Sequence, residues 1–209
     1  MREIVRETRI DLIRHGEPIG GRRYRGHRID DPLSETGWAQ MWNAVGEFAA
    51  WDQIVSSPMQ RCRAFAEALA ARHGIPLTLE PRFREVGFGS WEGRTPAEIQ
   101  AHNRAGYEAF YRDPVNQRPP GAELLDSFIE RVVSAYAALA ENPHGRHLLV
   151  VTHAGVIRAI IAHVLYASPL GLYRIKVENA GVTRIRHGRQ GGILEFHNGA
   201  LQGTLADPA

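Results

Sequence analysis

Residues 9–17 read Arg-Ile-Asp-Leu-Ile-Arg-His-Gly-Glu, and this stretch decides the fold. Its apolar residues lead into Arg14, His15 and a glycine-containing loop, which predicts a buried strand that ends in a turn. In open α/β sheets, ligands bind outside the carboxyl ends of the strands. Arg14 and His15 are expected at such an edge, as a permanent cation beside a ring that can act as a base or a nucleophile. A single histidine after a strand is more often structural than catalytic, so its role depends on the rest of the chain.

Length and composition indicate an ordinary globular protein. The chain has 209 residues, of which 44% are hydrophobic and 23% charged, and we expect one domain over residues 1–209. The formal net charge of +2 does not indicate a nucleic-acid-binding protein. The sequence shows no signal peptide, and no apolar run approaches the roughly 18–20 residues that a membrane span needs. Cys62 is the only cysteine, which excludes an internal disulfide and favours the cytoplasm.

A second strand and helix follow the opening stretch. Residues 34–48 have the apolar spacing of a helix, which Ser34 or Thr36 could cap, and residues 52–55 form a short strand. Ser57 is then expected to cap another helix, with Pro58 in its first turn and Gln60 completing a capping box. Arg61 would therefore lie in the first turn of a helix after a strand, at the same sheet edge as His15 if the strands are parallel.

The middle of the chain contains an irregular loop and an insertion. After a third strand at 77–79, residues 81–93 follow no secondary-structure period, which is typical of an ordered functional loop, and Glu85 lies within it. Thr95 and Glu98 form a capping box for a helix that ends near Asp113. Residues 95–120 resemble an inserted lid, and a longer helix is expected from Glu123 to about residue 141.

The last third repeats the opening pattern. Residues 147–152 form a near-continuous apolar strand of the kind that is buried on both faces. His153 follows that strand directly and precedes a helix, whose N-terminal N–H groups favour an anion. The tail predicts edge strands at 182–187 and 193–197, joined as a hairpin that could pair with a second copy as a homodimer.

Three strand-to-helix transitions thus bring Arg14 with His15, Arg61, and His153 to one edge. Two guanidinium groups match the oxygens of a phosphate, and a neutral histidine among cations stays nucleophilic at neutral pH. Glu85 is the best-placed carboxylate to protonate a leaving oxygen, although Glu17 and Glu92 lie near enough in sequence to compete. The pattern predicts phosphoryl transfer through a phosphohistidine.

Four spaced motifs resemble those of the histidine phosphatase superfamily, branch 1, which is phosphoglycerate mutase-like. They are Leu-Ile-Arg-His-Gly-Glu at 12–17, Ser-Ser-Pro with Arg61, Arg-Glu-Val-Gly-Phe-Gly at 84–89, and Val-Thr-His-Ala-Gly at 151–155. The resemblance implies an α/β fold, a three-layer α/β/α sandwich with a mostly parallel central sheet. It also implies that His15 is the nucleophile and Glu85 the general acid, with Arg14, Arg61 and His153 around the phosphate, and that no metal or cofactor is needed.

The loop after the first strand both follows and departs from that family. Where many members carry Ser or Thr and Asn, this chain has residues 18–21, Pro-Ile-Gly-Gly. The next residues, with the segment at 32–37, resemble small phosphatases such as α-ribazole phosphatase. By that likeness the substrate-binding residues include Arg25, Gly26, His27 and Ala154. The arginines of this loop are either a solvated cluster or a guard that selects anionic substrates; they are Arg22, Arg23, Arg25 and Arg28.

The leading functional hypothesis is a phosphomonoesterase that acts on a small phosphorylated metabolite. α-Ribazole 5′-phosphate is one candidate, with sugar phosphates and phosphoglycerates as others. The alternatives are a phosphoglycerate mutase and, from another class, a regulatory protein that binds a phospho-ligand without turnover. The length favours hydrolysis, since mutases are usually longer. Nucleic-acid binding ranks last, because only the cluster of arginines at 22–28 suggests it.

Overall fold

A six-stranded sheet forms the centre of the computed structural model, which describes residues 7–141 and 145–201. The strand order is β3-β2-β4-β1-β5-β6. The four strands from β1 to β4 run parallel to one another, whereas β5 and β6 are antiparallel. The strands are β1 (Thr8–Arg14), β2 (Gln53–Ser56), β3 (Leu77–Leu79), β4 (His147–Thr152), β5 (Val182–Gly188) and β6 (Gly191–Gly199).

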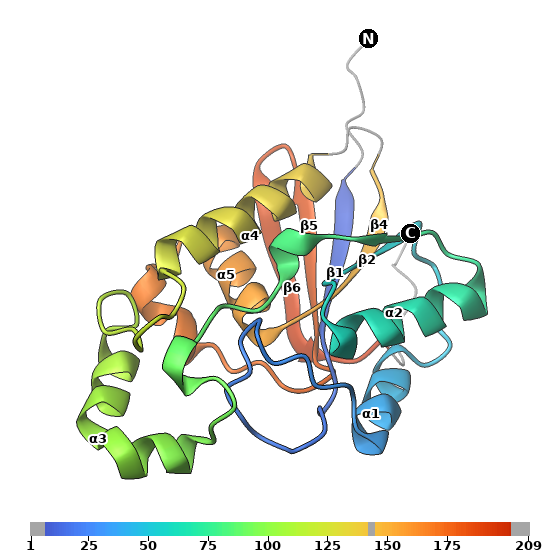
Figure 1. Ribbon diagram of the computed structural model, residues 1–209. Helices are drawn as coiled ribbons and strands as arrows, with labels where there is room; N and C mark the ends of the chain where they lie inside the picture. The colour runs from blue at the N-terminus through green and yellow to red at the C-terminus, as the bar shows by residue number, and fades with distance from the viewer. Residues whose placement is uncertain (1–6, 142–144, 202–209) are drawn as a thin grey trace.

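Helices cover both faces of the sheet. Helices α1 and α2 pack on one face and α4 and α5 on the other, while α3 lies beyond the sheet on the side of α4 and α5 (Figure 1). The predicted three-layer α/β/α class is thereby confirmed. The helices are α1 (Glu35–Val45), α2 (Gln60–His73), α3 (Pro96–Arg112), α4 (Leu125–Ala140) and α5 (Ala154–Val164), with short 3₁₀ turns η1 (Pro81–Phe83), η2 (Gly89–Trp91) and η3 (Pro169–Arg174).

The position of β1 explains where a site forms. β1 and β4 are neighbours, yet the chain leaves β1 toward β2 on one side of the sheet order and leaves β4 toward β5 on the other, so the direction of the connections reverses between them. Ligand sites in open α/β sheets lie at such a switch point, outside the carboxyl ends of the strands. Because Arg14 pairs with Thr152 at those ends, His15 and His153 leave adjacent strands together.

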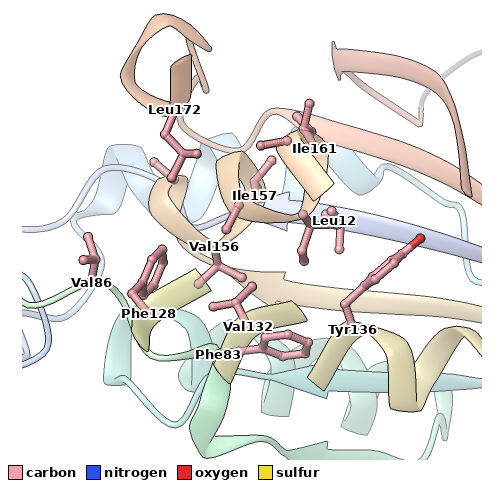
Figure 2. Close-up of a cluster of buried hydrophobic side chains, with 14 of the residues drawn as sticks. Leu12, Phe83, Val86, Phe128, Val132, Tyr136, Val156, Ile157, Ile161 and Leu172 are labelled. Carbon is pink, nitrogen blue, oxygen red and sulfur yellow. The ribbon is translucent and has the colours of Figure 1, made fainter. Parts of the chain in front are cut away.

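The strands β1 and β4 are buried on both faces. Leu12 and Val150 belong to the apolar cluster under α4 and α5, whereas Ile13 and Val151 belong to the cluster under α1 and α2. Burying each such side chain contributes about 1.5–3 kcal/mol, which accounts for the continuous apolar runs. Figure 2 shows part of the first cluster, to which β1 contributes Leu12, α5 contributes Val156 and Ile157, and α4 contributes Phe128 and Tyr136.

Two predicted helix starts are confirmed. Ser34 caps α1 by accepting a hydrogen bond from the N–H of Gly37. Thr95 and Glu98 form the complete capping box at the start of α3.

The predicted capping box of α2 is wrong. The helix begins at Gln60, and Met59 is its N-cap with no side-chain hydrogen bond. Ser57 instead lies with its Oγ 2.7 Å from Nε2 of His153, and the N–H of Gln60 donates to Asp30, which comes from the loop after β1. The hydroxyl of Ser57 still accepts from the N–H of Met59, at 3.3 Å, but its shorter contact runs across the sheet edge to His153.

Other boundaries differ from expectation by small amounts. Helix α4 begins at Leu125 rather than at Glu123, because the backbone N–H of Glu123 donates to the carbonyl of Gly87. The hairpin is present, but of its two strands only β6 is an edge strand, because β5 pairs with both β1 and β6.

The loop after β1 is held against α1 by two glycines. A Cβ on Gly16 would collide with the carbonyl of Gly37, and a Cβ on Gly37 would collide with that of Glu17. The hydroxyl of Ser34 also donates to the carbonyl of Glu17. This backbone contact sets the direction in which the chain leaves His15.

Asp11 is the centre of a buried network of hydrogen bonds away from the site. Asp11 is fully buried; it accepts two hydrogen bonds from Arg184, at 2.6 and 3.0 Å, and one from Trp51 at 2.9 Å. His147 Nε2 lies 2.8 Å from the same carboxylate. Burial raises the pKa of Asp11, but hydrogen bonds with His147 and Arg184 outweigh it and hold that pKa below its usual range.

Replacing Asp11 by asparagine is expected to lower the free energy of unfolding by about 3 kcal/mol, because Arg184 keeps a buried charge without its carboxylate. Urea denaturation at pH 7 measures this. An exposed pair supplies the control: Glu108→Gln, which breaks the contact with Arg104, should leave the free energy of unfolding nearly unchanged. A depressed carboxyl pKa stabilises the fold above the unfolded pKa of about 3.9, and the effect is lost as the pH falls through the folded pKa. The difference between Asp11→Asn and the parent should therefore shrink only below about pH 4.

Candidate active site

Two histidines meet at the switch point. The rings of His15 and His153 have centroids 5.3 Å apart and cross at 65°. His15 is 5% exposed and His153 is fully buried. The expectation that parallel strands bring them to one edge is met.

The ring of His15 is oriented by its own neighbour. Its Nδ1 lies 2.8 Å from the carbonyl oxygen of Gly16. A carbonyl only accepts, so Nδ1 carries the proton and Nε2 keeps its lone pair. Burial, with the nearby charges of Arg61 and Arg14, lowers the pKa of His15 well below its ordinary value. The ring is therefore neutral at pH 7, with Nε2 available as a nucleophile.

Arg14 and Arg61 supply two fixed cations beside His15. Nη1 of Arg14 donates to the carbonyl of Val177 at 2.6 Å, and burial lowers the pKa of Arg14 to about 10, which leaves it protonated at neutral pH. Arg61 is 1% exposed and donates to the carbonyls of Gly26 and Ile29, each at 3.0 Å.

Both guanidinium groups retain an unused donor. Among the described residues, five buried side-chain polar atoms have no hydrogen-bond partner, and Nε of Arg14 and Nε of Arg61 are two of them. A buried donor without a partner costs about 1–3 kcal/mol. Positive charge of this kind, next to the N-terminus of α5, suits a phosphate group.

His153 is surrounded by polar groups of Ser57 and Cys62. Besides the contact with Ser57, its Nε2 lies 3.6 Å from Sγ of Cys62, whose thiol donates to the carbonyl of Thr152. Burial raises the pKa of Cys62, so that group is a neutral thiol. Burial and the charge of Arg61 lower the pKa of His153 well below its usual value. His153 is therefore neutral, with its orientation set by Ser57.

Glu85 reaches the same edge from the loop after η1. One carboxylate oxygen accepts a hydrogen bond from the N–H of Gly155 at 3.3 Å, and the other accepts from the N–H of Val86 at 2.9 Å. A Cβ on Gly155 would collide with this carboxylate. Glycine in the first turn of α5 therefore leaves the space that Glu85 occupies. The sequence marked that turn as an anion site without indicating which anion it holds.

The competing carboxylates are placed differently. Both oxygens of Glu92 accept backbone N–H groups, from Phe88 and Arg28, and Glu92 does not line the cavity described below. Glu17 lines the cavity from the side of α1, with one oxygen 3.4 Å from the hydroxyl of Ser34.

A cavity of about 710 Å³ opens over these groups. Most of the predicted site residues line it, and His27 and His153 do not: His153 lies beneath its floor. Pro96 and Tyr111 bring the 95–120 segment into its wall. The predicted residues that line the cavity are Arg14, His15, Arg25, Gly26, Arg61, Glu85 and Ala154.

Two of the predicted substrate-binding residues are occupied by contacts within the protein. Arg25 is 7% exposed and donates to Asp31 at 2.8 Å and to the carbonyls of Ile19 and Gly21. His27 Nδ1 lies 3.3 Å from the carbonyl oxygen of Glu85.

The arginine cluster divides into three parts. Arg25 holds the loop together, Arg22 and Arg23 are exposed and line the cavity, and Arg28 is exposed outside it. Further cations that the sequence did not single out also line the wall, namely Arg158, Arg174 and Lys176. The cavity is therefore suited to an anionic ligand.

Within residues 7–141 and 145–201, no three or more His, Cys, Asp or Glu side chains are grouped to hold a metal ion. No helix among the described residues is both long enough and apolar enough to cross a membrane.

Known proteins are similar to this chain in sequence and in fold. The family profile described as "Histidine phosphatase superfamily (branch 1)" matches residues 10–199. Adenosylcobalamin/alpha-ribazole phosphatase of Escherichia coli is 29% identical over 175 residues, covering 81% of this chain and 85% of that protein. The solved structure of a mycobacterial glucosyl-3-phosphoglycerate phosphatase aligns with a TM-score of 0.81 and 26% identity, covering 93% of this chain and 100% of that one.

A longer relative matches over part of its length. A bifunctional protein of Mycobacterium tuberculosis is 32% identical over 181 residues, which cover 84% of this chain and 49% of that protein. The chain thus spans about half the length of the curated relatives that share 32% identity with it.

Proposed function

We propose that this chain, which belongs to branch 1 of the histidine phosphatase superfamily, is a phosphomonoesterase that hydrolyses a small phosphorylated metabolite through a phosphohistidine. The observation that carries the proposal is His15 itself. Its Nδ1–H donates to the Gly16 carbonyl, and its Nε2 is unprotonated with the charges of Arg61 and Arg14 nearby. A nucleophile positioned beside fixed cations provides most of what phosphoryl transfer requires.

In the first half-reaction, Nε2 of His15 attacks phosphorus as the bond to the leaving oxygen breaks. Arg14, Arg61 and His153 bind the phosphate oxygens. Glu85, protonated at this stage, transfers its proton to the departing alkoxide, which leaves as an alcohol.

In the second half-reaction, water attacks the phosphorus of phosphohistidine. The carboxylate of Glu85 takes the proton of that water, the N–P bond breaks, and inorganic phosphate leaves. His15 regains its lone pair, and Glu85 is again protonated for the next cycle.

The substrate we propose first is α-ribazole 5′-phosphate. The relative from Escherichia coli that carries this compound in its name is matched over most of its length. Aromatic side chains line one side of the cavity and suit the flat base of a nucleoside; they are Tyr24, Phe88, Tyr111 and Tyr173. In this view the 95–120 segment acts as a lid that contributes Tyr111, and Arg25, Gly26 and Ala154, which also line the cavity, contact the substrate.

Phosphate release over a panel of phosphorylated metabolites tests the function. We expect free phosphate from several compounds and a kcat/KM for α-ribazole 5′-phosphate at least about 10-fold above those of 3-phosphoglycerate and sugar phosphates, a margin of about 1.4 kcal/mol. Phosphate exchange between glycerate positions without net release would instead establish a mutase. Binding without turnover of any compound would indicate a phospho-ligand-binding regulator.

We also propose a cytoplasmic location and a homodimer. The first rests on Cys62, a buried free thiol, which suits a reducing compartment. The second rests on β6, an edge strand that a second copy could extend.

A further inference from the structure

Arg131 lies on α4 and grips the loop that carries Glu85. Its Nη1 donates to the carbonyls of Arg82 and Arg84, at 2.5 and 2.9 Å, and its Nη2 lies 3.3 Å from the carbonyl oxygen of Glu85. One guanidinium group thus holds three backbone oxygens, at the end of η1 and in the loop that follows it. The Cζ atom of Arg131 lies 4.8 Å from the centre of the Phe128 ring, over which the guanidinium group packs.

Glu123 completes the contact from the segment before α4. Its carboxylate accepts two hydrogen bonds from Arg131, at 2.7 and 2.9 Å. It also accepts from the N–H of Gly87 at 3.0 Å, while its own N–H donates to the Gly87 carbonyl. The side chain is 18% exposed, so the pair is largely shielded from water. Together, Glu123 and Arg131 hold the backbone on both sides of Glu85.

Neither residue lines the cavity, and the polar atoms of both are engaged with each other and with the backbone of residues 82–87. The Glu85 carboxylate, in contrast, is held by single hydrogen bonds to the N–H groups of Val86 and Gly155. Its position over the phosphate therefore depends on where the backbone of residues 84–87 lies. A shift of about 1 Å in a reacting group can reduce a rate by about 100-fold.

We propose that Glu123 and Arg131 are positioning residues for the general acid: they fix the loop so that the Glu85 carboxylate meets the leaving oxygen. The inference rests on the proposed phosphatase function and on Glu85 as its acid. It predicts a particular pattern of loss, because an acid matters most when the leaving group is a poor one. p-Nitrophenolate departs with little need of a proton, whereas a simple alkoxide requires one.

The test uses Arg131→Lys and Glu123→Gln in the full chain, with p-nitrophenyl phosphate and an alkyl phosphate as substrates. Lysine keeps the charge but lacks the planar fork that reaches several oxygens at once, and glutamine keeps the volume but loses the charge. We expect kcat/KM for the alkyl phosphate to fall about 10- to 100-fold and that for p-nitrophenyl phosphate to fall less than about 3-fold. Glu80→Gln is the matched control, since it breaks the neighbouring pair with Arg82 and should change neither value.

The double variant Glu85→Gln/Glu123→Gln separates this inference from the proposed function. If Glu123 acts through Glu85, the second substitution adds nothing to the first on the alkyl substrate. Full additivity, equal losses on both substrates, or no loss in both single variants would overturn the positioning role. A Glu85→Gln variant with no preference between leaving groups would instead remove Glu85 as the acid. If Arg131→Lys does not fold, Glu123→Gln alone decides.

Discussion

Replacement of His15 by alanine is expected to lower the rate of phosphate release by about 10⁴-fold or more. Removing the nucleophile from a group of residues that act as a unit costs about as much as removing all of them. Arginines that still bind the phosphate cannot supply the lost lone pair. The variant should bind inorganic phosphate nearly as well as the parent, because Arg14 and Arg61 keep their contacts with Val177, Gly26 and Ile29.

Rapid quench in alkali after mixing with ³²P-labelled substrate identifies the intermediate directly. Label should appear on a peptide that contains His15, should be acid-labile and stable to base, and should be absent from His15→Ala. His163→Ala serves as the control, because this exposed histidine of α5 lies outside the cavity. Label on His153 or Ser57, or full activity in His15→Ala, would contradict the mechanism.

The charge state of His15 also governs the pH profile. Its pKa is lowered well below 6.5, so the nucleophilic form persists as the pH falls from 7 to 6. A histidine with an ordinary pKa would lose roughly two thirds of that form over the same range. We therefore attribute any fall in kcat/KM between these values to the phosphate of the substrate, whose second pKa is about 6, and the acid limit set by His15 should lie lower.

Most of the fold and the core of the site could be predicted because the sequence signals were local. The apolar runs of β1 and β4 specify strands buried on both faces, and each ends directly in a histidine. The parallel arrangement then follows from alternating strands and helices. Ser34 and Thr95 follow cap chemistry because each hydroxyl accepts from an N–H of the helix while it donates to a second oxygen, of Glu17 and Glu98 respectively.

Ser57 shows why the remainder could not be predicted. Its sequence context was that of a helix cap, yet its hydroxyl lies against His153, 96 residues later in the chain. Gly155 likewise gave no sign that it makes room for Glu85, which comes from a different connection. Contacts of this kind depend on which loops the sheet order places together, and no local period encodes them.

The sequence alone does not decide which glutamate is the general acid, because Glu17, Glu85 and Glu92 all lie near the predicted edge. The structure supports Glu85 through its contacts. Glu92 is engaged by two backbone N–H groups away from the cavity, and Glu17 lines the cavity with one oxygen 3.4 Å from the hydroxyl of Ser34. The carboxylate of Glu85 accepts a hydrogen bond from the N–H of Gly155, in the first turn of α5, where backbone N–H groups would face the phosphate. On the proposed mechanism, a proton carried there would lie close to both the phosphate and the leaving oxygen.

Glu85→Gln is therefore expected to reduce kcat/KM for an alkyl phosphate by about 10²- to 10⁴-fold, the usual contribution of a general acid or base. The loss on p-nitrophenyl phosphate should be much smaller for phosphorylation of His15, because that leaving group needs no proton. The second half-reaction still lacks its base, so phosphohistidine should accumulate and a burst of p-nitrophenolate should precede slow turnover. Glu17→Gln is the comparison: a larger loss of alkyl phosphate hydrolysis there than in Glu85→Gln, together with a burst, would assign the acid to Glu17 instead.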